Sequence, residues 1–263
     1  MTTRLAVAVL ILMLLSVGAF WQPYSPDAID LAHRFAAVTP DHLLGTDNLG
    51  RDLVSRLMAA GWRTALVIVA VGAIGFLGGS LLGTGAAMLG RTPEAVILRA
   101  AETFIVVPTL IVGLVVAALF GLSPLSAGIA LGLANLGPYT LMAHTLTKSI
   151  LAESYVHAAR AIGLGEGRLM LRHVLPATLP TILTYAGSQA AGSAVAYASL
   201  SFIGLGADPS QPNWGSMLFE YRLFLFDHPS LVLLPGAALA LGAAALNLTF
   251  DNDHRPDEGR RMP

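Results

Sequence analysis

The stretch TALVIVAVGAIGFLGGSLLGTGAAML, residues 64–89, contains no charged side chain and decides the fold class. A helix that crosses ~30 Å of hydrocarbon at ~1.5 Å per residue needs ~20 apolar residues. This stretch exceeds that length, and five more apolar stretches are long enough to consider. We therefore expect about six membrane spans, at residues 5–21, 64–89, 100–120, 125–146, 178–205 and 231–250.

The composition of the whole chain agrees with this prediction. Of 263 residues, 55% are hydrophobic and 12% are charged, whereas soluble proteins carry roughly 25% charged residues. The formal net charge of −1 favours no polyanionic partner such as nucleic acid. Cysteine is absent, which excludes disulfides, iron–sulfur clusters and thiolate zinc sites. We expect an all-α, polytopic membrane protein in which residues 1–263 form one transmembrane domain.

The first apolar stretch has a second interpretation. Arg4 before a short apolar run, with the small residues Val17 and Ala19 near its end, is also typical of a cleaved signal peptide. We expect a retained span, and six spans place both termini on the same side of the membrane.

Basic residues predict the orientation. With a cytoplasmic N-terminus, ten of the lysine and arginine residues lie inside and five lie outside, as the positive-inside rule requires. This orientation makes both termini cytoplasmic. It places the basic segment 148–176 in the cytoplasm, and the polar segments 22–63 and 206–229 in the periplasm.

The cytoplasmic segment predicts two short helices joined at a glycine turn. One helical face is formed by residues at i, i+3, i+4 and i+7: Tyr155, Ala158, Ala159 and Ile162. Gly163 and Gly165 can end this helix. A second amphipathic stretch follows, and we expect Pro176 to break it before the fifth span. Such a surface suits docking into a groove of a soluble partner; the alternative is a helix pair lying on lipid headgroups.

Small and polar residues inside the spans are candidates for packing or for a translocation path. Gly75, Gly79 and Gly83 form a face that lets another helix approach closely. This face suits packing in the bundle or, alternatively, a subunit interface or path. Four polar residues lie deep in the spans and either line a path or bond helices together: Asn135, Ser188, Gln189 and Ser193.

Several kinds of chemistry have no motif in this chain. The only lysine, Lys148, lacks the glycine pattern of a nucleotide-binding P-loop, so ATP hydrolysis needs another chain. The histidines show no metal-binding spacing, and we expect no catalytic residue, metal site or cofactor here. A membrane enzyme would need clustered acids or histidines, and only Glu102 and His144 lie near a membrane boundary. A scaffold that recruits a partner is the other alternative.

Three ordered motifs resemble those of a known family. Ala158-Ala159, Gly163 and Leu175-Pro176 resemble the so-called EAA loop of permease subunits of bacterial ATP-binding-cassette importers. The segments HLLGTDNLGRDLVSRL, residues 42–57, and LSFIGLGADPSQPNWGSML, residues 200–218, resemble segments of the dipeptide/oligopeptide/nickel class. The similarity runs from about residue 23 to 247, and the pattern looks like the second, C-type permease of a pair.

The resemblance implies an inner-membrane importer with several partners. These are a second, homologous permease, two ATPase subunits that bind ATP and magnesium, and a periplasmic or lipid-anchored substrate-binding protein, all acting at a lipid membrane. The resemblance gives the coupling role to Tyr155, Ala158, Ala159, Gly163, Leu164, Gly165, Leu175 and Pro176. His157 stands where other importers often have glutamate, and it is not interpreted as a metal ligand.

The resemblance leaves the cargo open. Small peptides are the commonest cargo of the class and are the first expectation. Nickel or a metal chelate is the alternative, because the stretches AIDLAHR and SRLMAA look more like nickel-type members.

Overall fold

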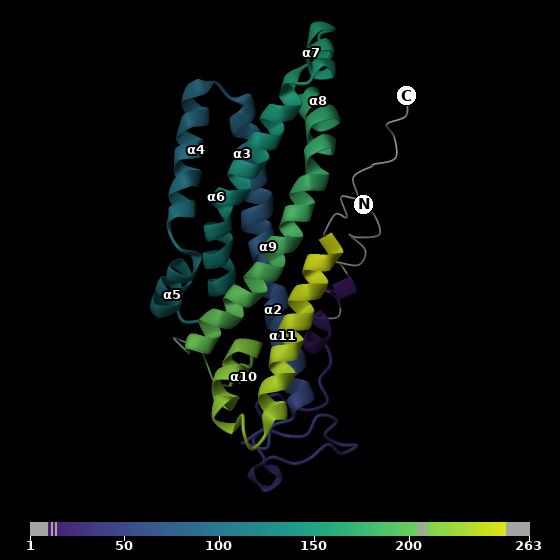
Figure 1. Ribbon diagram of the computed structural model, residues 1–263, viewed down its shortest axis with the longest axis vertical. Coiled ribbons are helices and arrows are strands. Elements are labelled where there is room, and N and C mark those ends of the chain that lie inside the picture. Colours follow the sequence, from purple (N-terminus) through teal and green to yellow (C-terminus); the bar gives the residue numbers. More distant parts are fainter. Residues whose placement is uncertain (1–9, 12, 14, 205–207, 209, 251–263) are drawn as a thin grey trace, which may run out of the picture.

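The computed structural model describes residues 10–11, 13, 15–204, 208 and 210–250, and these residues form a helical bundle (Figure 1). Three of its helices are long and apolar enough to cross a membrane: Leu53–Met88, Pro124–Leu151 and Pro229–Thr249. A bent helix pair would be a fourth crossing. The prediction of an all-α, polytopic membrane protein is confirmed. Residues 5–9, 12 and 14 of the first predicted span, residues 5–21, lie outside the described residues.

The longest helix runs from Leu53 to Met88 in three parts. These are α2 (Leu53–Val71), a π-helical stretch η3 (Gly72–Gly79) and α3 (Ser80–Met88). It begins well before the predicted span 64–89, because Asp52 caps it by accepting a hydrogen bond from the Ser55 N–H at 2.8 Å. Before it lie two short turns, η1 (Val17–Ala19) and η2 (Leu31–His33), and η1 packs against α2.

Helix α6 (Pro124–Leu151) runs parallel to α2–α3 and touches it along the glycine face. A β-carbon at Gly75 would lie 3.0 Å from the Asn135 β-carbon, and one at Gly79 would lie 2.6 Å from that of Tyr139. A β-carbon at Gly83 would overlap the Thr140 carbonyl. The glycine face is therefore occupied by packing within the chain, and it is not a free subunit interface or path.

We expect Gly83→Ala to destabilise the protein by about 1–3 kcal/mol, because the added methyl group forces two packed backbones apart. Gly85 is the matched control, since nothing lies within 4 Å of a β-carbon there. Thermal unfolding in detergent, followed by tryptophan fluorescence, should show a lower midpoint for Gly83→Ala and an unchanged or higher one for Gly85→Ala. Equal midpoints would contradict the assigned contact.

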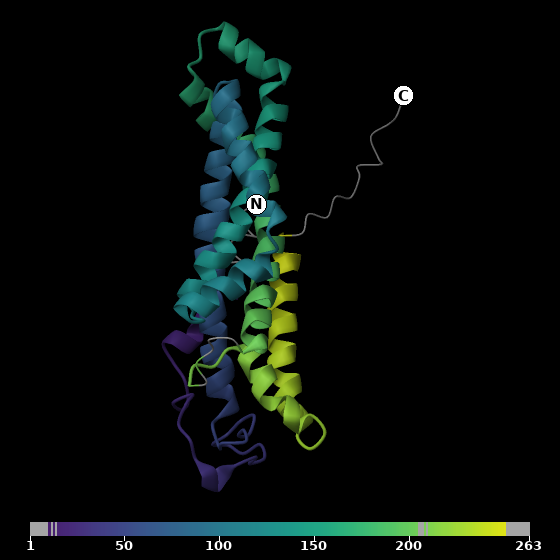
Figure 2. The same ribbon diagram turned by 90° about the vertical axis from the view of Figure 1, so that its left-hand side faces the viewer.

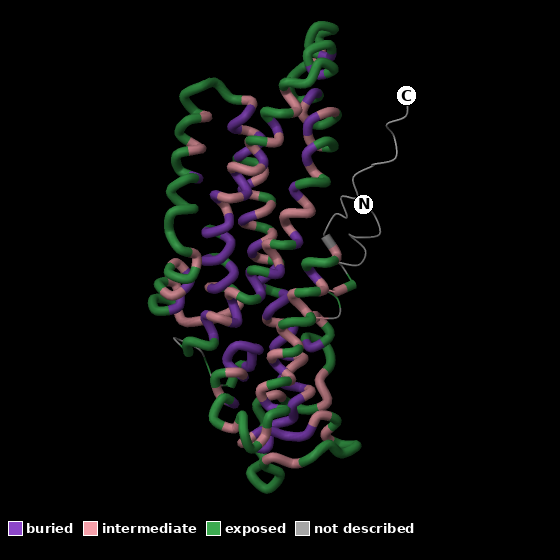
Figure 3. Tube along the Cα trace, in the orientation of Figure 1, coloured by how far each residue is buried: buried purple, intermediate pink, exposed green. Residues whose placement is uncertain are grey.

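The third predicted span, residues 100–120, covers parts of two helices. The chain forms α4 (Arg91–Val106) and α5 (Thr109–Phe120), which meet at an angle of 80°. Pro108 causes the break, because a proline disfavours helical geometry in the residue before it, and Val107 is extended with ψ 120°. Most of α4 is exposed (Figure 3).

Pro176 does not break the helix before the fifth span, contrary to the prediction. The short helix α8 (Glu166–Leu169) continues through a π-helical turn η4 (Met170–Val174) into α9 (Leu175–Ile203). Pro176 lacks the N–H that would bond to the preceding turn, and the wider π-helical turn just before it relieves the clash of its ring with the preceding carbonyl. α9 contains residues 178–203 of the predicted span 178–205, but its serines, threonines and glycines make it less apolar than the three helices named above.

The two polar regions lie at opposite ends of the bundle (Figure 1, Figure 2). Helix α7 (Ser154–Ala161) and α8 form one end. The other end holds the loops before α2, together with α10 (Trp214–Tyr221), η5 (Arg222–Phe224) and the start of α11 (Pro229–Phe250). A hydrophobic cluster around Leu53, Trp214 and Met217 joins α2 to α10 at this second end.

Candidate functional site

The turn between α7 and α8 is built around Gly163. Its φ of 87° lies in the left-handed region, where a β-carbon is costly. The Leu164 N–H donates to the Ala159 carbonyl at 3.1 Å, and the Gly163 N–H donates to the Arg160 carbonyl at 2.9 Å. This is a Schellman motif, which ends helices. Gly165 has an ordinary φ of −66° at the start of α8, so its backbone does not require glycine.

Some residues of the predicted docking face of α7 are exposed to solvent, and others are buried. Val156 and Ala159 are buried and pack against α8. Tyr155, Ala158 and Ile162 are exposed, with Ile162 at 86%. Ala159, which was predicted on one helical face with these three residues, is buried, because its spacing of three from Val156 turns it toward the bundle.

Of the remaining predicted coupling residues, Leu164 supports the turn from below. Leu164 is half-buried and packs on the cluster formed by Val156, Ala159 and Leu169. Leu175 is half-buried and Pro176 is exposed in the first turn of α9. The turn therefore has an apolar underside against the bundle and an exposed, partly apolar outer face.

An ion pair closes the outer side of the turn. Arg160 Nε donates to Glu166 Oε1 at 2.8 Å, and Arg160 Nη2 donates to Glu166 Oε2 at 2.9 Å. These hydrogen bonds lower the pKa of the Glu166 carboxyl below its usual value. The pair links the end of α7 to the beginning of α8 across Gly163.

The polar residues predicted for a path separate into two groups. The Gln189 side-chain amide donates to Asn135 Oδ1, which joins α9 to α6, and the Ser193 hydroxyl donates to the Gln189 carbonyl at 2.6 Å. Asn135 and Ser193 are buried, and Gln189 is half-buried. Ser188 is exposed on the opposite side of α9. Three of the four residues thus bond within the bundle, and only Ser188 faces outward.

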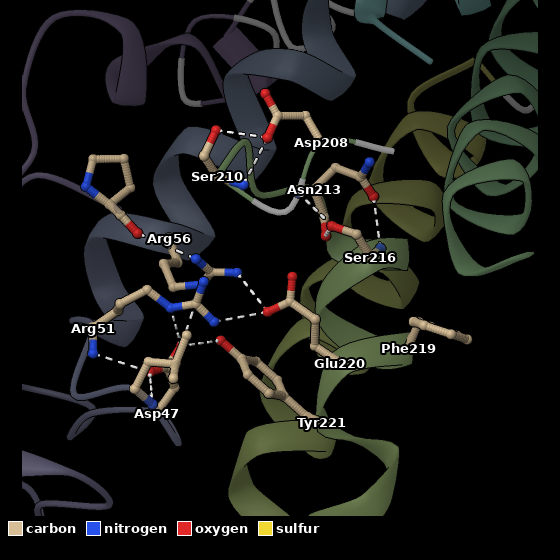
Figure 4. Close-up of polar contacts among 12 residues, drawn as sticks. Asp47, Arg51, Arg56, Asp208, Ser210, Asn213, Ser216, Phe219, Glu220 and Tyr221 are labelled. Atoms are coloured by element: carbon tan, nitrogen blue, oxygen red, sulfur yellow. Dashed lines mark hydrogen bonds and ion pairs between the residues drawn. The ribbon is translucent and has the colours of Figure 1, made fainter. Parts of the chain in front are cut away.

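At the opposite end of the bundle, five residues, of which Glu220 is half-buried and the others buried, form an ionic group that we call the cap network (Figure 4): Asp47, Arg51, Arg56, Glu220 and Tyr221. Asp47 Oδ2 accepts from Arg51 Nε at 2.7 Å and from the Tyr221 hydroxyl at 2.9 Å. Glu220 Oε2 accepts from Arg51 at 2.8 Å and from Arg56 at 3.0 Å.

The cap network joins the loop before α2, α2 itself and α10. Arg56 is fully buried, and its charge is compensated by the two carboxylates. Burial raises the pKa of the Tyr221 phenol, so the phenol stays protonated and donates to Asp47. The sequence analysis assigned no role to these residues. The alternation of acids and arginines over residues 47–56 was the sequence signal that could have indicated an ionic group. Glu220 lies 164 positions after Arg56, so no local pattern connects the two residues.

Glu102 and His144 do not come together as a catalytic pair. Glu102 pairs with Arg99 at 3.1 Å on an exposed face. His144 Nε2 lies 2.8 Å from Glu94, which also pairs with Lys148 at 2.9 Å, so this group joins α4 to α6. Within the described part of the chain, no three histidine, cysteine, aspartate or glutamate residues are grouped so that they could hold a metal ion.

A family model described as the inner membrane component of binding-protein-dependent transport systems matches residues 75–252, which contain the α7–α8 turn. The chain belongs to this family. The permease is similar to the probable D,D-dipeptide transport system permease protein DdpC of Escherichia coli (strain K12), with 31% identity over 95% of this chain and 85% of that protein.

Two further relatives extend the range of named cargoes. The nickel transport system permease protein NikC of Escherichia coli (strain K12) is 31% identical over 96% of this chain and 93% of its own length. The metal-staphylopine import system permease protein CntC of Staphylococcus aureus (strain Mu50 / ATCC 700699) is 30% identical over 87% and 79%. Together these findings identify an inner-membrane permease subunit of an ATP-binding-cassette importer of the peptide/nickel class.

We expect Asp47→Asn to destabilise the permease by about 3–5 kcal/mol, because it leaves the buried Arg56 short of a compensating charge. Asp27→Asn is the matched control, since Asp27 is exposed and its side chain bonds to Ser25. Unfolding midpoints in detergent, followed by the buried Trp214, measure both variants. A midpoint for Asp47→Asn equal to that of Asp27→Asn would contradict the structural role of the network.

Proposed function

We propose that this permease and a second, homologous permease form a translocation path for small peptides, and that the α7–α8 turn docks on ATPase subunits. The observation that carries the proposal is the outer face of this turn. Tyr155, Ala158 and Ile162 are exposed there, on a helix end that is fixed by the Gly163 turn and by the buried Val156. An exposed apolar helix face at the tip of a bundle suits a groove on a partner protein.

The orientation proposed for the chain follows from the two ends of the bundle. The basic segment with α7 and α8 lies in the cytoplasm, and the cap network with its loops lies in the periplasm. Both termini are cytoplasmic. A substrate-binding protein, periplasmic or lipid-anchored, docks on the cap side, and the two ATPase subunits dock on the turn.

The chain itself performs no catalysis in this proposal. ATP and magnesium bind to the partner ATPase subunits, because the P-loop pattern needed to hold them is missing from this sequence. Closure of the ATPases moves the α7–α8 turn, and the paired permeases alternate between inward- and outward-facing states by rigid-body motion. This chain contributes its half of the path.

One face of α9 is the proposed lining of that path. It carries small or hydroxyl side chains at exposed positions, namely Ala177, Thr181, Ser188 and Gly192. The exposed face of α11 carries Leu233, Leu241 and Leu248 instead. Hydrocarbon tolerates leucine and penalises unpaired hydroxyls, so the α11 face suits lipid and the α9 face suits a polar path or a partner permease.

Peptides are the proposed cargo, and nickel or a metal chelate is the second candidate. Peptide transport is supported by the relatives named as dipeptide and peptide permeases. The metal alternative is supported by the equally similar nickel and metal-staphylopine permeases.

Affinity purification of the tagged chain from detergent-solubilised native membranes tests the assembly. We expect mass spectrometry to recover a second permease and ATPase subunits with it. The co-purifying binding protein can then be titrated with tri-alanine and with nickel chelates to decide the cargo. Recovery of this chain alone, under conditions that preserve other membrane complexes, would contradict the proposal.

Gly163→Pro should uncouple the importer, because proline cannot adopt the positive φ at the turn. We expect the chain to remain membrane-inserted but to lose ATP hydrolysis stimulated by the binding protein. Gly165→Ala is the control, since Gly165 has a negative φ and open space around it. Normal stimulated hydrolysis in Gly163→Pro would refute the coupling role of the turn.

Ser188→Leu should lower the rate of cargo uptake severalfold, because a bulky apolar side chain would narrow and dehydrate the proposed path. Ala237→Leu is the control, as Ala237 is exposed on the leucine-rich face of α11. Uptake into proteoliposomes that contain the whole importer is the measurement, with complex yield recorded for each variant. Equal uptake by the two variants would exclude Ser188 from the path.

A further inference from the structure

We propose that the Arg160–Glu166 ion pair is a positioning element that sets the angle between α7 and α8. It thereby sets how the exposed face of α7 meets the ATPase partner. The inference rests on the proposed coupling function of the turn. Its structural part, the fixing of the angle, can be tested on the chain alone.

The pair spans the one left-handed residue of the turn. Arg160 lies in the last turn of α7 and Glu166 in the first turn of α8, with Gly163 between them. Both carboxylate oxygens accept from different guanidinium nitrogens, at 2.8 and 2.9 Å. Such a two-point contact between planar groups fixes their mutual orientation as well as their distance.

Apart from the two backbone hydrogen bonds of Gly163 and Leu164, few contacts restrain this side of the turn. A β-carbon at Gly163, Gly165 or Gly167 would meet nothing within 4 Å, so side-chain packing does not fix the backbone around Glu166. The apolar contacts of Val156 and Leu169 lie on the underside, against α6 and α7. They hold the two helices together, and the ion pair restricts their rotation about Gly163.

Global stability does not depend on this pair. Both side chains are substantially exposed, and an exposed ion pair shifts an equilibrium by at most about fivefold. The buried cluster keeps the turn folded when the pair is removed. Loss of the pair therefore broadens the range of angles at the turn and leaves the fold intact.

Spin labels can measure this range, because the chain has no native cysteine. Cysteines at Ser154 and Leu171, which are both exposed, place one label on α7 and one on η4. In lipid nanodiscs, we expect Glu166→Ala and Arg160→Ala to broaden the distance distribution equally, and the double variant to broaden it no further. Glu153→Ala is the control, an exposed acid at the start of α7 with no capping hydrogen bond. A wild-type distribution in Glu166→Ala would overturn the proposal.

The functional part is tested on the complex purified with its own ATPase subunits. We expect Glu166→Ala to lower stimulated ATP hydrolysis by about two- to fivefold, the range set by one exposed ion pair, with unchanged recovery of ATPase subunits. The charge swap Arg160→Glu with Glu166→Arg should restore at least half of the loss. Recovery is incomplete because the swapped charges oppose both helix dipoles.

Two outcomes separate this inference from the coupling function itself. If Gly163→Pro uncouples the importer while Glu166→Ala hydrolyses ATP normally, the positioning role is overturned and the coupling role stands. If Arg160→Ala loses the ATPase subunits and the charge swap restores nothing, Arg160 contacts the partner directly, which also overturns the positioning role.

Discussion

The close approach of α2–α3 to α6 is the constraint on which the rest of the bundle depends. Glycines at 75, 79 and 83 let two backbones meet where any side chain would separate them. In a bilayer, helices gain little from hiding apolar surface from one another, so close backbone packing supplies much of their association. The other helices pack around this central pair, and α9 is joined to it by the Gln189–Asn135 hydrogen bond.

Helix α9 gives the two ends of the permease a mechanical connection. It continues without interruption from α8 to Ile203, so one helix connects the α7–α8 turn to the opposite end of the bundle. At its far end, the Asn213 side-chain amide donates to the Ser201 hydroxyl at 2.6 Å. Gly215 lies so close to the Ala198 carbonyl that a β-carbon at Gly215 would overlap it. These contacts fix α10, which carries Glu220 and Tyr221 of the cap network.

Sequence patterns predicted those features of the structure that depend on residues close together in the chain. The apolar lengths predicted an all-α membrane protein, and Gly163 predicted the end of α7. The sequence contained Pro108 and Pro176, but only the structure separates an 80° bend at the first from a continuous helix at the second. The outcome depends on whether a π-helical turn and neighbouring helices absorb the missing hydrogen bond. The ion pair of Arg56 with Glu220 could not be predicted from the sequence, because no local pattern relates residues that lie so far apart in the chain.

The parallel arrangement of α2–α3 and α6 has a topological consequence. α6 begins beside the middle of Leu53–Met88, near Val67 and Ala70, and both helices run toward the α7–α8 end, so the segment that joins them has to return over that part of the bundle. Helices α4 and α5 are that segment. The bent pair therefore carries the chain back from the end of α3 to the start of α6, which then returns to the end that holds the α7–α8 turn.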